Sequence, residues 1–159
     1  MYVSDIMRQR QALVTVSPEA DLEEVVYRFD NSVSLSRLIY VISEQDLLLG
    51  VVGAADILAL LLPRAKELPN GAAQDRSLFE RALAEHIGEH RSRSVAHIMR
   101  TDYPSAKPGH PLVQATDLLL DSGAWVMPVL DDKGILAGEI TRRLLLRYTA
   151  HAVLQMPPN

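Results

Sequence analysis

The sequence predicts a mixed α/β (α+β) fold in which one small unit occurs twice. The first observation is a repeated pattern, Val-x-x-Ile-Met-Arg, which begins at Val3 and again at Val95. The second is an amphipathic helical pattern that follows each copy, after Pro18 and after Pro108. The third is a pair of short apolar runs around a turn, closed by another apolar helical pattern. Each unit is therefore predicted to run strand, helix, strand, strand, helix.

The first helix of each copy is predicted from side chains spaced i, i+3, i+4 and i+7. This spacing places them on one face of a helix, which can then cover a sheet. Ser17 is expected to cap the first of these helices, because its hydroxyl can accept a backbone N–H and Pro18 follows where a missing N–H costs nothing. The positions are Leu22, Val25, Val26 and Phe29 in the first copy and Leu112, Ala115, Thr116 and Leu119 in the second.

Two apolar runs joined by a turn follow each helix and predict a β-hairpin. The turns read Ser43-Glu44-Gln45-Asp46 and Asp131-Asp132-Lys133-Gly134, and residues of these types favour tight turns. The predicted strands span residues 38–42 and 47–52 in the first copy and 126–130 and 135–140 in the second. The closing helices are predicted over residues 54–62 and from 142 to about 154.

The chain is predicted to divide into the two copies, a helical insert between them and a short tail. The insert opens with prolines, an asparagine and a glycine, which interrupt regular structure. It continues with Ser77-Leu78-Phe79-Glu80, a pattern typical of a capping box at the start of a helix. The predicted boundaries are 1–62 for the first copy, 63–94 for the insert, 95–155 for the second copy and 156–159 for the tail.

Composition limits the classes of function. The 159 residues carry a net charge of −4, which gives no general attraction to nucleic acid. The chain has no cysteine, and this excludes disulfide and thiolate chemistry. Neither a signal peptide nor a membrane-spanning run is visible, so we expect a cytoplasmic protein. No nucleophile-and-base pattern indicates an enzyme, and His86 and His90 are interpreted as a solvated helix face rather than a metal site.

The order of the elements and a short motif after each hairpin resemble the CBS-domain family. The family's motif is a Gly, two apolar residues, Thr or Ser, two free positions and Asp. It reads Gly50-Val51-Val52-Gly53-Ala54-Ala55-Asp56 in the first copy and Gly138-Glu139-Ile140-Thr141-Arg142-Arg143-Leu144 in the second. Met127-Pro128-Val129 is also similar to the family's strand signature.

The resemblance implies a tandem CBS pair, or Bateman module, whose repeats pack pseudo-symmetrically, sheet against sheet. Two clefts then lie between the repeats. Many such pairs bind AMP, ADP, ATP or S-adenosylmethionine in one or both clefts, and the pairs usually associate further into a homodimer.

In the first copy, the resemblance indicates a nucleotide site. Asp56 falls at the family's ribose-binding position, and an ionised carboxylate can accept two hydrogen bonds from a ribose diol. Arg37 precedes a strand where a basic residue meets the phosphates in some relatives. A plain helix cap for Asp56 and a solvated surface charge for Arg37 are the alternative interpretations. The other predicted contacts are Val51, Gly53, Thr101, Ala124, Trp125 and Thr141.

The second copy departs from the family's motif. Leu144 replaces the Asp, and Trp125 stands where Arg37 would align, so we expect at most one intact nucleotide site in the chain. The predicted function is a stand-alone regulatory module that is not an enzyme and requires no cofactor. It would bind AMP, ADP, ATP or S-adenosylmethionine between its repeats and signal to an unidentified effector protein. The alternative is a purely structural or protein-interaction module with empty clefts. Gly53 also favours this alternative, because it replaces the Thr or Ser of the motif and so lacks the hydroxyl.

Overall fold

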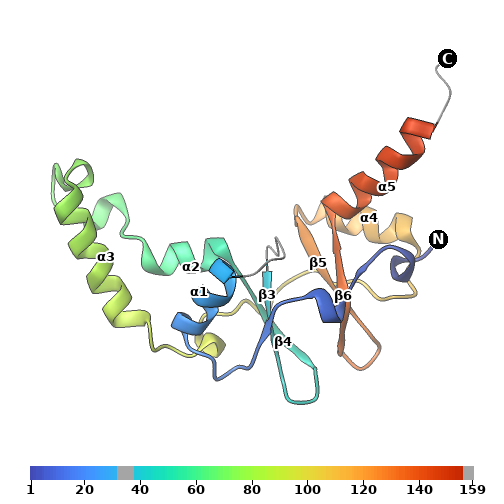
Figure 1. Ribbon diagram of the computed structural model, residues 1–159, viewed down its shortest axis with the longest axis horizontal. Helices are drawn as coiled ribbons and strands as arrows, with labels where there is room; N and C mark the ends of the chain where they lie inside the picture. Colours follow the sequence, from blue (N-terminus) through green and yellow to red (C-terminus); the bar gives the residue numbers. More distant parts are fainter. Residues whose placement is uncertain (32–37, 156–159) are drawn as a thin grey trace.

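The computed structural model describes residues 1–31 and 38–155, and its strands form two small sheets that pack against each other (Figure 1). One sheet has the order β2-β3-β4 and the other the order β1-β6-β5. The strands are β1 (Arg8–Gln9), β2 (Thr15–Val16), β3 (Leu38–Ile42), β4 (Leu48–Gly53), β5 (Val126–Leu130) and β6 (Leu136–Thr141). The α-helices are α1 (Leu22–Asn31), α2 (Ala54–Leu61), α3 (Arg76–His90), α4 (Leu112–Asp121) and α5 (Arg142–Gln155). The predicted mixed α/β fold is confirmed, and the predicted tail at 156–159 lies outside the described residues.

The helix starts differ from the predicted ones. Asp21 caps α1 in place of Ser17, because its Oδ1 accepts the backbone N–H of Glu24 at 2.9 Å. The insert forms the predicted helix, α3, but Asp75 caps it in place of Ser77. In both cases a carboxylate stands closer to the helix start and interacts favourably with the positive end of the helix dipole. In the described residues, no helix is both long enough and apolar enough to cross a bilayer.

The opening segment of each copy joins the sheet of the other copy. β1 pairs antiparallel with β6, which places Arg8 opposite Glu139. At the equivalent place, Arg100 pairs with Val51 of β4 through two backbone hydrogen bonds of 2.9 and 2.8 Å. The two copies are therefore interlocked, and the sheet of each copy is extended by a strand or bridge from its neighbour.

A shared core and paired turns complete the contact between the copies. Each sheet packs on its helices through an apolar core that also includes the other copy's opening segment, with Val95 in the first core and Val3 in the second. A third cluster joins the two sheets. The two hairpins bond to each other at 3.1 Å, from Leu48 N–H to the Gly134 carbonyl and from Leu136 N–H to the Asp46 carbonyl. The buried members of the joining cluster are Leu13, Leu38, Tyr40, Val51, Val126 and Leu136.

Two motif glycines lie where the opening segments cross the sheets. A Cβ on Gly138 would lie 2.3 Å from the backbone oxygen of Arg8. A Cβ on Gly50 would lie 2.5 Å from Sδ of Met99, which belongs to a flexible side chain. Each glycine therefore permits a close approach between copies that a side chain would obstruct.

We expect Gly138→Ala to lower the free energy of unfolding by about 1–3 kcal/mol, because the added methyl group would clash with the backbone of Arg8, which cannot move as a side chain can. Gly50→Ala should cost less, since the Met99 side chain can move. Urea unfolding measures both changes. Gly88→Ala is the control, because an added Cβ there meets nothing within 4 Å, and replacing a glycine inside a helix should raise stability by about 0.5–1 kcal/mol. A larger loss at Gly50 than at Gly138 would contradict this account of the crossing.

Candidate functional site

The predicted nucleotide contacts fall into two groups, one at the same corner of each sheet. The corner is the place where the last strand of a copy leads into its closing helix. Arg37 lies outside the described residues. The first group contains Val51, Gly53 and Asp56, with Thr101 directly after the Arg100 bridge to β4. The second group contains Ala124, Trp125 and Thr141.

Asp56 is held at the first corner by two different segments of the chain. Its Oδ2 accepts the backbone N–H of Gly53 at 2.7 Å, which closes the start of α2. The Nε atom of Arg100 lies 3.0 Å from each carboxylate oxygen. The Asp56 side chain is 19% exposed and that of Arg100 is 50% exposed. The helix cap is thus present, and a salt bridge from the opening segment of the second copy accompanies it.

The second corner has a hydroxyl and a cation but no carboxylate. Oγ1 of Thr141 accepts the backbone N–H of Leu144 at 3.1 Å and so caps α5. Nε of Arg142 donates to the carbonyl of Ala124 at 2.7 Å, and the guanidinium lies 5.1 Å from the centre of the Trp125 ring. This is the geometry of a cation–π contact. The two corners therefore offer different chemistry, an acidic acceptor at one and a stacked guanidinium at the other.

A buried carboxylate joins the two copies. Glu139 of β6 is 1% exposed. Its Oε2 accepts a hydrogen bond of 2.5 Å from the hydroxyl of Tyr40, a residue of β3 in the other sheet. Its second oxygen lies 3.1 Å from Nη2 of Arg8 in an ion pair. One acid of the second copy is therefore held by two side chains of the first.

Burial governs the ionisation of this contact. Desolvation raises the pKa of Glu139 above its ordinary value, while the Tyr40 hydrogen bond and the charge of Arg8 act in the opposite direction. Burial and the charge of Glu139 raise the pKa of Tyr40 well above 10.0, so its hydroxyl remains a donor at physiological pH. Nε and Nη2 of Arg8 are buried and make no well-aligned hydrogen bond. The ion pair with Glu139 therefore has to offset the cost of removing the guanidinium from water.

The sequence analysis did not identify this contact, although two signals for it were present. Glu139 is a charged residue inside the apolar run 135–140, and a buried charge needs a partner. The repeated pattern also ends in an arginine each time, and both of these arginines cross to the other copy's sheet. The partners were not predictable, since Tyr40 and Glu139 stand 99 positions apart.

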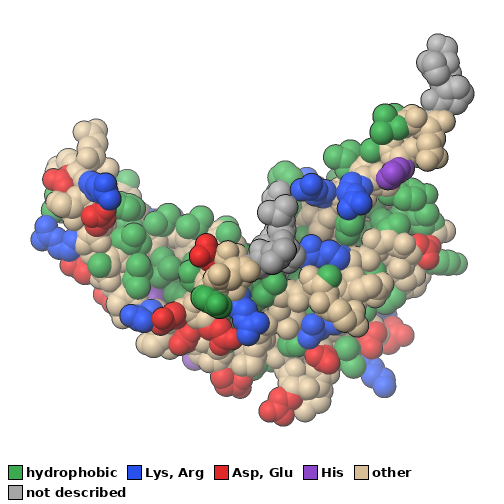
Figure 2. Space-filling model, in the orientation of Figure 1, with side chains coloured by type: hydrophobic (Ala, Val, Ile, Leu, Met, Phe, Trp, Pro, Cys, Tyr) green, Lys and Arg blue, Asp and Glu red, His purple; other side chains and the backbone are tan. Residues whose placement is uncertain are grey.

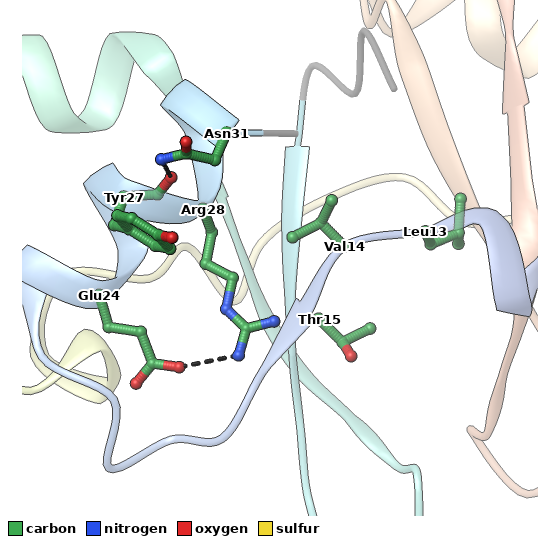
Figure 3. A pocket seen from close by; sticks show the side chains of 7 residues that line it. All are labelled: Leu13, Val14, Thr15, Glu24, Tyr27, Arg28 and Asn31. Carbon is green, nitrogen blue, oxygen red and sulfur yellow. Dashed lines mark hydrogen bonds and ion pairs between the residues drawn. The ribbon is translucent and has the colours of Figure 1, made fainter. Parts of the chain in front are cut away.

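Two other features lie away from the predicted contacts. A hollow of about 540 Å³ lies between α1 and β2 (Figure 3), and none of the predicted nucleotide contacts among the described residues lines it. In it Arg28 is paired with Glu24 at 3.0 Å, so this cation is already neutralised. On α3, the rings of His86 and His90 lie 6.5 Å apart. Within the described ranges, no three His, Cys, Asp or Glu side chains are grouped to hold a metal ion.

Comparison with known proteins identifies both halves of the chain. The family model of the CBS domain matches residues 3–63 and 95–151. No curated protein matches the sequence significantly. Among solved structures, the CBS-pair protein CBSX2 from Arabidopsis thaliana superposes with a TM-score of 0.76 at 23% identity, over 98% of this chain and 98% of that one.

Several similar structures contain adenine ligands. CBSX2 in complex with AMP gives a TM-score of 0.72 at 24% identity, over 96% of this chain and 98% of that one. The CBS domain pair of MJ0100 was solved with 5′-methylthioadenosine and S-adenosyl-L-methionine, and gives 0.66 at 16% identity, over 96% and 98%. The cytosolic domain of the Mg²⁺ channel MgtE with ATP gives 0.63 at 19% identity, over 89% of this chain and 46% of that one. At these identities the likeness establishes the fold.

We expect Glu139→Gln to change how stability depends on pH. The pKa of Glu139 is raised by folding, so its contribution to stability is complete below the unfolded value, near 4.5, and is lost as pH rises through the folded value. Wild type should therefore lose stability relative to Glu139→Gln as pH rises from about 4 toward neutrality.

Urea unfolding at a series of pH values measures this difference. The control is Glu44→Gln, which removes the same charge from an exposed turn. Parallel curves for wild type and Glu139→Gln, or a relative loss on the acid side, would show that the carboxylate is not buried as described.

Proposed function

The chain belongs to the CBS domain family as a tandem pair, and we propose that it is a regulatory module that binds an adenine nucleotide beside Asp56. The proposed ligands are AMP, ADP, ATP and S-adenosylmethionine, and no cofactor is required. The support from relatives is that CBSX2 was solved with AMP and the MgtE domain with ATP. The chain would act by binding rather than by catalysis, which is the general role of such pairs.

The observation that carries the proposal is the position of the Asp56 carboxylate. It is 19% exposed, and its oxygens meet donors from two segments, the Gly53 amide and the Arg100 guanidinium. An ionised carboxylate is a pure acceptor, so Asp56 could receive hydrogen bonds from the two hydroxyls of a ribose. Its neighbours come from both copies, so a ligand here would touch both.

The remaining contacts are proposed from the family resemblance. Arg37 would meet the phosphates, and Val51 and Gly53 would line the slot on the side of the first copy. Gly53 is buried and carries no side chain, so its backbone can approach a ligand closely. From the second copy, Thr101 is proposed to line the same slot. Ala124, Trp125 and Thr141 belong to the second corner and are proposed as contacts only of a ligand bound there.

A ligand that touches both copies would favour one arrangement of them, and this change would be the signal. Exposed apolar side chains on the helices offer surfaces for a partner. Figure 2 shows hydrophobic side chains grouped over α2 and α3 and again over α4 and α5. Leu58 of α2 is 52% exposed, Leu120 of α4 55% and Leu146 of α5 67%.

We propose that such faces pair two copies of the chain in a homodimer and that an effector protein, whose identity is open, receives the signal in the cytoplasm. Apolar groups exposed in this number favour association. Sedimentation equilibrium distinguishes the dimer from a monomer.

A structural or protein-interaction module is the second candidate, and particular residues favour it. Asp56 is already satisfied by the Gly53 amide and by Arg100. Gly53 offers no hydroxyl to a ligand, and Leu144 removes the carboxylate from the second corner. Under this reading both corners serve only to start helices.

Thermal unfolding in the presence of each ligand separates the two candidates. A ligand at 100 times its dissociation constant should add about 2.7 kcal/mol of stability, or about 5–10 °C for a chain of this size. Asp56→Ala should abolish the shift. The matched control is Thr141→Ala, which also removes a helix-start hydrogen bond and should retain most of the shift.

Loss of the shift in Thr141→Ala but not in Asp56→Ala would mean that the ligand occupies the other corner, and equal loss in both variants would mean that binding does not depend on Asp56 in particular. No shift with AMP, ADP, ATP or S-adenosylmethionine would favour the structural module.

A further inference from the structure

We propose that Arg100 sets the specificity of the Asp56 site by competing with the ribose for the carboxylate, so that a ligand with a phosphate displaces it best. This inference rests on the proposed function, since it concerns the same site. Arg100, which lies outside the family's motif, would then determine whether the site prefers a nucleotide or a nucleoside.

The competition follows from how the Asp56 oxygens are already used. Two donors reach them: the Gly53 amide donates to Oδ2 at 2.7 Å, and Arg100 Nε donates to the same oxygen while it lies 3.0 Å from both oxygens. A carboxylate has about four lone-pair sites. Two of these sites remain open by count, but a ribose diol that binds across both oxygens needs the space where the Arg100 guanidinium lies. The diol and Arg100 therefore compete for the same side of the carboxylate.

Arg100 is the contact that can give way. The Gly53 amide is fixed at the junction of β4 and α2. The Arg100 backbone is also fixed, by its two hydrogen bonds to Val51, but its side chain is 50% exposed and makes no other hydrogen bond in the described part of the chain. The guanidinium can therefore swing away from Asp56 while its Cα stays beside the site.

The released guanidinium then selects the ligand. Its backbone anchor keeps it within a side chain's length of the ribose, so the phosphate of AMP can replace the lost carboxylate as its anion. Adenosine presents the same base and ribose but no anion, and its binding would leave Arg100 without a partner. The site should therefore prefer AMP to adenosine, because only AMP offers the Arg100 guanidinium a replacement anion.

The same competition is absent from the other copy. Arg8 occupies the equivalent place, but its partner is the buried Glu139, and Leu144 stands where the second corner would need a carboxylate. Of the two corners, only the Asp56 corner therefore has an arginine paired with the carboxylate that would accept the ribose.

Isothermal titration of AMP and of adenosine into wild type and Arg100→Met tests the proposal. Methionine keeps an unbranched apolar stem and removes every donor. We expect the affinity for AMP to fall by about tenfold, because a charge-assisted hydrogen bond is lost. The affinity for adenosine should rise by about two- to fivefold, because a partly exposed ion pair no longer opposes it.

Two further variants complete the test. Arg100→Lys should recover part of the AMP affinity, because it restores the charge without the planar grip. Arg93→Met removes the same charge from an exposed position of the same segment and should change neither affinity. If both affinities fall together in Arg100→Met, or neither changes, the proposal is overturned while the nucleotide site stands. If wild type and every variant bind neither compound, the nucleotide site itself is wrong and this inference falls with it.

Discussion

The contact on which the rest of the structure depends is the buried meeting of Glu139 with Tyr40 and Arg8. A charge taken out of water is costly unless it is paired and hydrogen-bonded, so these three side chains restrict how the two sheets can sit. Removal of one partner would leave a buried charge or hydroxyl unsatisfied. The contact therefore specifies the register of one copy against the other, in addition to the apolar core that both sheets share.

The exchange of opening segments also brings residues of both copies together beside Asp56. Because each segment crosses to the other copy's sheet, Arg100 of the second copy lies against Asp56 of the first. The proposed site is therefore composed of both copies even without a ligand. A ligand that displaces the Arg100 side chain from Asp56 would remove one salt bridge between the copies while the backbone pairing of Arg100 with Val51 remains.

Much of the fold was predictable because it is local. Strands 38–42 and 126–130 were predicted with the bounds that the structure shows, since apolar runs between turn residues specify hairpins. The helix caps at Asp21 and Asp75 were missed, because a nearby serine competed with them in the sequence. The exchange of segments was not predictable from spacing, since pairing between copies depends on contacts far apart in the chain. The same reason hid Arg100, whose partner Asp56 stands 44 positions away.

A crystal structure of the chain grown with AMP tests the central claim most directly, because it locates the ribose, the phosphate and both side chains at once. The account predicts both ribose hydroxyls within hydrogen-bond distance of the Asp56 carboxylate, with the Arg100 guanidinium turned from Asp56 to the phosphate. AMP bound beside Thr141 and Trp125, with the Asp56–Arg100 pair intact, would contradict it.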